Sequence, residues 1–204
     1  MDDSERLRMS KKRDHKIMIT EEAIRKVPFI RYREIPEDEY EIIHELAKQV
    51  LRLSKDENES NEVAITYSFD TEKVILQEKL VGVQFGDEHS VNPMADTLSY
   101  HLIMSSKECM VVSMHNHPSV SLISVADMRF FLQYGSIRLL VIVTNLGSIS
   151  YMVKSRRYDY VKAVRLLNQT IQLHNKASNL KEHQKAARYF IGNCHKAGII
   201  YENR

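Results

Sequence analysis

The 204-residue sequence is poor in cysteine and has no apolar run long enough to cross a membrane. Its two cysteines, Cys109 and Cys194, cannot build a disulfide framework and are too few for the usual thiolate-rich structural zinc site. A membrane-spanning helix needs about 20 consecutive apolar residues, which no segment approaches. The first 16 residues, MDDSERLRMSKKRDHK, are charged throughout and lack the apolar core of a secretory signal. We therefore expect a cytoplasmic protein that does not bind membranes.

Glycine-rich phosphate-binding loops, internal repeats and low-complexity tracts are also missing. What is present is the composition of an ordinary globular protein, with 43% apolar and 27% charged residues. A chain of this length fits one domain with extensions and can bury a sizeable core.

Charge is divided unequally along the chain. Residues 155–204 contain ten Lys or Arg and three Asp or Glu, a net charge of +7, so residues 1–154 carry about −5 of the total of +2. A basic segment suggests nucleic acid or an acidic protein as a partner. Two helices with solvated basic faces explain the same count, and we favour them because aromatic residues are not interleaved with the charges. Nucleic acid therefore stays a possible partner of the basic C-terminal segment, but not the favoured one.

Residues that can carry chemistry concentrate in one stretch, residues 111–131 (VVSMHNHPSVSLISVADMRFF). The apolar run over residues 109–114 predicts a buried strand that ends in His115-Asn116-His117. Side chains two apart on a strand project to the same side, so both imidazoles should face one point at the strand end. Pro118 then ends the strand because it has no amide hydrogen to donate.

A helix start follows this strand. Ser124 suits the N-cap, and Asp127 lies at the third helical position, where a carboxylate interacts favourably with the positive helix end. From that first turn the carboxylate can face the strand end that carries the two histidines. Two imidazoles and one carboxylate leave the fourth position of a tetrahedral zinc to water, as in catalytic zinc sites. The sequence therefore predicts Zn²⁺ held by His115, His117 and Asp127.

Each half of this pattern also has a purely structural explanation. His-x-His at a strand end occurs by chance, and Ser-x-x-Asp before an apolar run is an ordinary capping box. We favour the metal site because strand, turn and helix are predicted in the order that the ligands need. A set of two histidines and one carboxylate also fits non-haem iron, so the identity of the metal stays open.

The run HNHPS at residues 115–119, followed by Ser124-x-x-Asp127, resembles the JAMM (MPN) metalloprotease superfamily and is most similar to its RadC-type and phage-associated bacterial branches. That family usually has seven residues between the second histidine and the serine, whereas this chain has six. A looser likeness extends over about residues 38–153. The resemblance implies an α/β fold, a mixed β-sheet covered by helices as in cytidine deaminases, and zinc-dependent hydrolysis of peptide or isopeptide bonds.

Hydrolysis of an amide also needs a group that takes a proton from water and passes it to the leaving amine, and Glu suits this task. In the family, this glutamate lies upstream of His-x-His, near the first sheet strand after the opening helix. The resemblance therefore implies Glu62, which begins the strand at Val63, as the general base, with Glu59 as its rival. By position alone, a solvent-facing acid at a strand end explains Glu62 equally well.

The same resemblance implies a second role for Ser124, besides that of N-cap. The equivalent serine of the family donates a hydrogen bond to the oxyanion of the tetrahedral intermediate. We expect that a single hydroxyl cannot both cap the helix and hold the oxyanion equally well.

Three regions are expected: an N-terminal arm and connector over residues 1–35, a JAMM/MPN-like domain over 36–154 and a basic helical C-terminal extension over 155–204. The middle region should contain helix, strand, strand, helix, strand, helix, strand and strand, in a mixed sheet. Its second strand is expected over residues 74–85, and the second helix of the extension over about 180–196. The buried face of the first helix of the extension is predicted to comprise Val161, Val164, Leu167 and Ile171.

Protein or peptide substrates are the expected partners, for example a ubiquitin-like conjugate. The alternative is a catalytically silent metal-binding module of the same fold that recruits partners, and a DNA-associated role is a further one. The position of Glu62 discriminates hydrolase from silent module, because a base far from the metal cannot serve the reaction.

Overall fold

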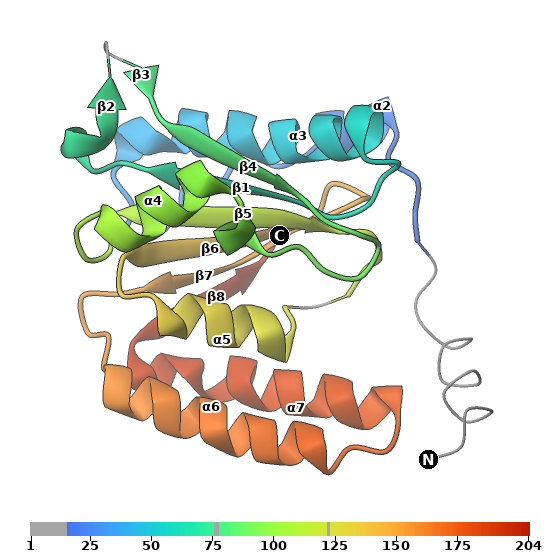
Figure 1. Ribbon diagram of the computed structural model, residues 1–204. Coiled ribbons are helices and arrows are strands. Elements are labelled where there is room, and N and C mark those ends of the chain that lie inside the picture. The colour runs from blue at the N-terminus through green and yellow to red at the C-terminus, as the bar shows by residue number, and fades with distance from the viewer. Residues whose placement is uncertain (1–15, 76–77, 122) are drawn as a thin grey trace.

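The computed structural model describes residues 16–75, 78–121 and 123–204 and shows a six-stranded mixed sheet between two layers of helices (Figure 1). Residues 1–15 of the predicted N-terminal arm lie outside the described residues. The strand order is β4-β1-β5-β6-β7-β8, and only β5 and β6 are parallel neighbours in this sheet. The prediction of an α/β protein with a mixed, helix-covered sheet is confirmed. The strands are β1 Val63–Ser68, β4 Val81–Phe85, β5 Val111–His117, β6 Ile137–Thr144, β7 Ile149–Lys154 and β8 Ile199–Asn203.

Helices cover both faces of the sheet because alternate side chains of its central strands are apolar on both sides. One core cluster joins α2 and α3 to residues such as Val112 and Met114 of β5. The other joins α4, α5, α6 and α7 to Val111 of the same strand. His115 and His117 share the side of Val111, whereas Asn116 shares the side of Met114. The helices are α2 Glu21–Lys26, α3 Tyr40–Glu57, α4 Thr97–Ser105, α5 Val125–Gln133, α6 Tyr160–Asn175 and α7 Leu180–Asn193.

The connection from β5 to β6 creates the candidate site. Two parallel neighbours cannot be joined by a tight turn, so the chain crosses one face of the sheet through α5. The start of α5 therefore lies beside the end of β5, as Figure 1 shows. This arrangement brings the Ser124-x-x-Asp127 segment next to His115-x-His117.

The C-terminal segment was predicted to be entirely helical, but it also contains a strand. After α7 and a short 3-10 turn, Gly198 adopts φ +71°, and the chain enters β8, which pairs with β7 along the sheet edge. Residues after the expected boundary at residue 154 pack against residues before it, because β8 completes the sheet and Ala163 and Phe190 belong to the hydrophobic core on one of its faces. Packing also crosses the boundary at residue 35, because Ile24 packs in the opposite core cluster.

Two other local predictions were wrong. The strand expected over residues 74–85 is divided, because β2 (Val74–Ile75) and β3 (Glu78–Lys79) form a separate two-stranded ribbon and only β4 joins the main sheet. On α6 the prediction was wrong for Val161, which is 65% exposed, because the helix turns Ala163 and Leu166 toward the core together with the predicted Leu167. No helix in the described part of the chain is long and apolar enough to span a bilayer.

Candidate metal centre

The two histidines lie at the end of the central strand β5, with only 6% of each residue exposed. Strand β5 is hydrogen-bonded to β1 on one side and to β6 on the other, which fixes its register. The strand ends at His117 because Pro118 has no amide hydrogen, and the carbonyl of Pro118 accepts a hydrogen bond from the amide of Ile17 at 2.7 Å. The two imidazoles are therefore held on a rigid support.

A capping box fixes the carboxylate of Asp127. The amide of Ser124 donates to Oδ2 of Asp127 at 2.7 Å, and the amide of Asp127 donates to Oγ of Ser124 at 3.1 Å. The bond to Oδ2 sets the orientation of the carboxylate and leaves Oδ1 facing His115 at 3.2 Å from its Nε2. The same local pattern that starts α5 therefore orients a potential ligand.

The potential ligand atoms of the three side chains lie close to the separations that a tetrahedral ion requires, two of them slightly closer together. Nε2 of His115 lies 3.1 Å from Nε2 of His117 and 3.2 Å from Oδ1 of Asp127, and Nε2 of His117 lies 3.5 Å from Oδ2 of Asp127. Zinc ligands bind at about 2.0–2.2 Å, so neighbouring ligand atoms of a tetrahedral site should be roughly 3.3–3.6 Å apart. His115, His117 and Asp127 could therefore hold a metal ion together.

The protonation of His117 also suits a ligand. Its Nδ1 lies 3.3 Å from the carbonyl oxygen of Ser121 and 3.1 Å from Oγ of Ser121. A carbonyl can only accept, so Nδ1 carries a hydrogen, and in the neutral imidazole the lone pair of Nε2 faces His115 and Asp127. Burial works to raise the pKa of Asp127, but the two imidazoles outweigh it and hold that pKa well below its ordinary value. The cluster therefore presents two imidazole nitrogens to an ionised carboxylate.

Glu62 lies on the same side of the sheet as the two histidines. Ala64 pairs with His115 in the antiparallel register, so Glu62, two residues earlier, faces the position of His117. The residue is only 7% exposed, and burial raises the pKa of its carboxyl above the ordinary value, although His115 and His117, when protonated, act in the opposite direction. A carboxyl group whose pKa is raised by burial and that lies beside two imidazoles has the environment of a general base.

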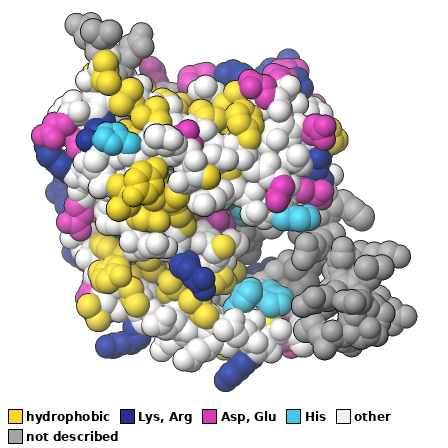
Figure 2. Space-filling model, viewed as in Figure 1, with side chains coloured by type: hydrophobic (Ala, Val, Ile, Leu, Met, Phe, Trp, Pro, Cys, Tyr) yellow, Lys and Arg dark blue, Asp and Glu magenta, His cyan; other side chains and the backbone are white. Residues whose placement is uncertain are grey.

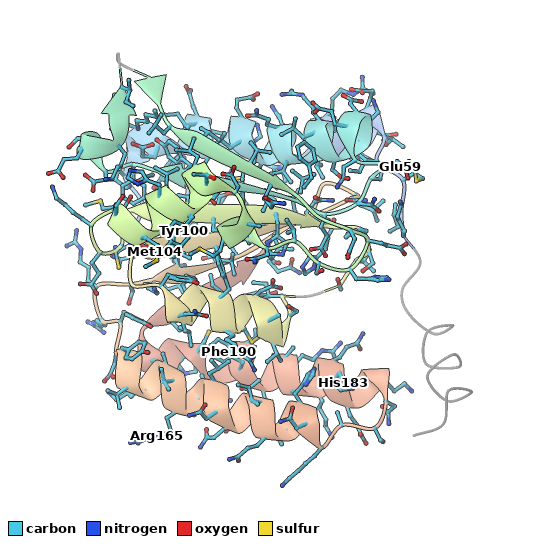
Figure 3. The ribbon with its side chains drawn as sticks, in the orientation of Figure 1. Glu59, Tyr100, Met104, Arg165, His183 and Phe190 are labelled. Carbon is cyan, nitrogen blue, oxygen red and sulfur yellow. The ribbon has the colours of Figure 1, made fainter. Side chains whose placement is uncertain are left out.

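Its rival Glu59 is placed differently. It lies in the turn after α3, where it adopts φ +49° and is exposed to solvent. Figure 3 shows its label at the edge of the molecule beyond the end of α3. The structure therefore brings Glu62, and not Glu59, together with the three predicted ligands.

Asn116 is a site residue that the sequence analysis missed. Its side chain is completely buried on the opposite face of the sheet from the histidines. Oδ1 of Asn116 accepts from the amide of Val63 at 2.7 Å, and its Nδ2 donates to the carbonyl of Asn61 at 3.1 Å. One carboxamide therefore holds the residues on both sides of Glu62 to the strand that carries the two histidines.

Asn145 extends this clamp to the next strand and to the N-terminal segment. Its Oδ1 accepts from Nδ2 of Asn116 at 2.8 Å, and its own Nδ2 donates to the carbonyls of Ile17 and Ser60 at 2.7 and 3.0 Å. Its amide donates to the carbonyl of His117 at 3.0 Å. The sequence did contain a signal for this clamp, namely an asparagine at a position where β5 should turn an apolar side chain inward. A buried carboxamide at such a position needs several hydrogen-bond partners.

Ser124 caps α5, but this role does not exclude the other. Its oxygen accepts the amide hydrogen of Asp127, which uses a lone pair and leaves the hydroxyl hydrogen to be donated elsewhere. The expectation that the two roles compete was therefore wrong on chemical grounds. The capping bond instead holds the hydroxyl beside the candidate ligands.

Comparison of the chain with protein-family models, with curated proteins and with solved structures gave no match. The interpretation of the centre therefore depends on its residues and their geometry. Those residues converge from three places, the start of β1, the end of β5 and the first turn of α5.

Proposed function

We propose that this chain is a metal-dependent hydrolase of peptide or isopeptide bonds, with Zn²⁺ held by His115, His117 and Asp127. The single observation that carries the proposal is the convergence of the three side chains: Nε2 of His115 lies 3.1 Å from Nε2 of His117, and these two nitrogens lie 3.2 and 3.5 Å from Oδ1 and Oδ2 of Asp127, respectively. Three ligands leave one position of a tetrahedral ion for the reaction, which is typical of catalytic rather than structural zinc. The resemblance of residues 115–127 to the JAMM superfamily supports the same reaction and the fold of that superfamily.

Each residue of the centre has a task in this reaction. A bound zinc ion would polarise the scissile carbonyl and lower the pKa of a water molecule in its open position to about 7. Glu62 accepts the proton of the attacking water on a carboxylate oxygen. It then delivers that proton to the nitrogen of the leaving amine, which cannot depart as an anion.

Ser124 stabilises the charge that develops on the carbonyl oxygen. Its hydroxyl hydrogen is free for this purpose because capping occupies only the oxygen lone pair. A donor fixed by a helix start needs little reorganisation during the reaction, which is the basis of oxyanion stabilisation. We propose protein or peptide substrates, including ubiquitin-like conjugates, because the chemistry of the centre suits any amide carbonyl.

Metal removal tests this proposal. The protein loaded with one equivalent of zinc should cleave members of a panel of peptides and ubiquitin-like isopeptide conjugates, and treatment with a chelator should abolish cleavage until zinc is restored. The Ser124→Ala variant should lose about 10²–10³-fold in kcat. Its unfolding free energy should fall by only about 1 kcal/mol, the usual cost of losing an N-cap.

Two results would contradict the proposal. Cleavage that continues after chelation would remove the metal from the reaction. Binding of zinc without cleavage of any substrate of the panel would favour the alternative of a silent metal-binding module that recruits partners.

A further inference from the structure

Two adjoining hollows lie far from the candidate metal centre. The larger, of about 550 Å³, lies where β7 leaves the sheet and β8 enters it, and the smaller, of about 190 Å³, lies between α6 and α7. Strand β7 runs antiparallel to β6, so its last residue, Lys154, lies at the opposite sheet end from His117. Lys162 and Lys196 line both hollows, which therefore form one continuous surface.

This surface, called here the basic groove, is lined by cations and by no carboxylate among the described residues. The larger hollow adds Arg33, Arg157 and His195 to the two shared lysines, and the smaller adds Arg165. Dark blue side chains project from the lower edge of the molecule, where α6 lies, and Figure 3 shows Arg165 on the outer side of that helix (Figures 2 and 3).

Most of these cations lack an acidic partner within the part of the chain that the structure describes. Lys162 pairs with Asp159 at 3.1 Å and Arg33 pairs with Glu202 at 3.1 Å. The salt bridges of the described residues include no pair made by the three other long cations of the groove, Arg157, Arg165 and Lys196. Unneutralised cations around a hollow create a positive field that attracts a polyanion.

Each hollow also contains a tyrosine. Tyr189, 37% exposed, lines the smaller hollow, and its hydroxyl donates to Oε1 of Gln169 at 3.2 Å, which restrains the ring. Tyr201 lines the larger hollow from the edge strand β8. Nucleic acid bases stack on aromatic rings beside cations that contact the backbone phosphates. An acidic peptide would use the cations but would gain nothing comparable from the rings.

We propose that the basic groove binds single-stranded nucleic acid, with phosphates at the arginine and lysine side chains and bases against Tyr189 and Tyr201. The alternation of cation and ring is created by the fold. Arg165, Tyr189 and Tyr201 come from three different elements, so the spacing along the chain gives no sign of it. The groove lies at the opposite end of the sheet from the metal centre, and its binding is therefore independent of the hydrolase proposal.

The test uses the full chain and a fluorescein-labelled dT oligonucleotide of 12 residues in a polarisation titration at 50 mM salt. The double variant Arg165→Glu/Lys196→Glu should bind at least about tenfold more weakly, and its dependence of log Kd on log salt should be shallower by about 1.4, since each lost phosphate contact on a single strand accounts for about 0.7. Tyr189→Ala should weaken binding by about tenfold through the loss of stacking.

The matched control is Lys181→Glu/Lys185→Glu, which changes the net charge equally on the exposed part of α7 outside the groove. Circular dichroism checks that all variants fold, and Arg165→Gln/Lys196→Gln repeats the test if the glutamates unfold the protein. Equal weakening by groove and control variants would overturn the proposal, as would equally tight binding of an oligoglutamate that Tyr189→Ala leaves unchanged. His115→Ala should bind the oligonucleotide normally.

Discussion

Replacing Glu62 with glutamine is expected to reduce hydrolysis by about 10²–10⁴-fold while metal binding persists, because a general base contributes about this much to the rate. Glutamine keeps the shape of the side chain but cannot accept a proton at neutral pH. The side chain is 7% exposed and burial raises its pKa, so the neutral variant should fold at least as stably. The measurements are kcat of the zinc-loaded protein, zinc content and the free energy of unfolding.

The matched control for Glu62→Gln is Glu59→Gln, three residues earlier in an exposed turn. It makes the same chemical change outside the cluster, so activity should stay within about twofold, as for most surface substitutions. Full activity of Glu62→Gln would assign the base to another residue. A large loss in Glu59→Gln would restore the rival that the structure places at the periphery.

Replacing Asn116 with alanine is expected to lower the free energy of unfolding by about 3–5 kcal/mol, because it leaves several buried polar groups without partners. The amide of Val63 and the carbonyl of Asn61 both lose their bond to the carboxamide. Activity should fall more than zinc affinity, because Glu62 loses its support while His115 and His117 keep their strand. Urea unfolding and a zinc titration measure the two effects.

Ser113→Ala is the matched control, three residues earlier on β5. Oγ of Ser113 is buried with no hydrogen-bond partner among the described residues, so its removal leaves no other polar group without a partner. The unfolding free energy should change by less than about 1 kcal/mol. A similar loss in both variants would mean that Asn116 matters only as packing volume and not as a clamp.

Sequence patterns predicted the parts of the fold that depend on local periodicity. Apolar residues recur at helical spacing at Ile43, Leu46 and Val50 in the sequence, and α3 buries all three. Strand β6, Ile137–Thr144, is a largely apolar run in the sequence, which is typical of a buried strand. The three ligands were also visible as spacings, because His-x-His and Ser-x-x-Asp each lie within one element and its cap.

Features that depend on tertiary pairing could not be predicted in this way. Strand β8 was missed because a short segment after a helix becomes a strand only when an edge such as β7 accepts it. The choice between Glu62 and Glu59 needed the register of β1 against β5, which a sequence does not contain. The clamp at Asn116 and the basic groove likewise join residues from separate elements.

The metal content of the protein tests the central claim most directly. Protein purified, stripped with chelator and dialysed against zinc should contain about one zinc ion per chain by elemental analysis, and zinc should raise the thermal midpoint by binding the folded state. His115→Ala and Asp127→Ala should each lose this zinc, whereas the exposed His101→Ala should retain it. A chain that binds no divalent metal, or binds it equally well without His115, would contradict the account.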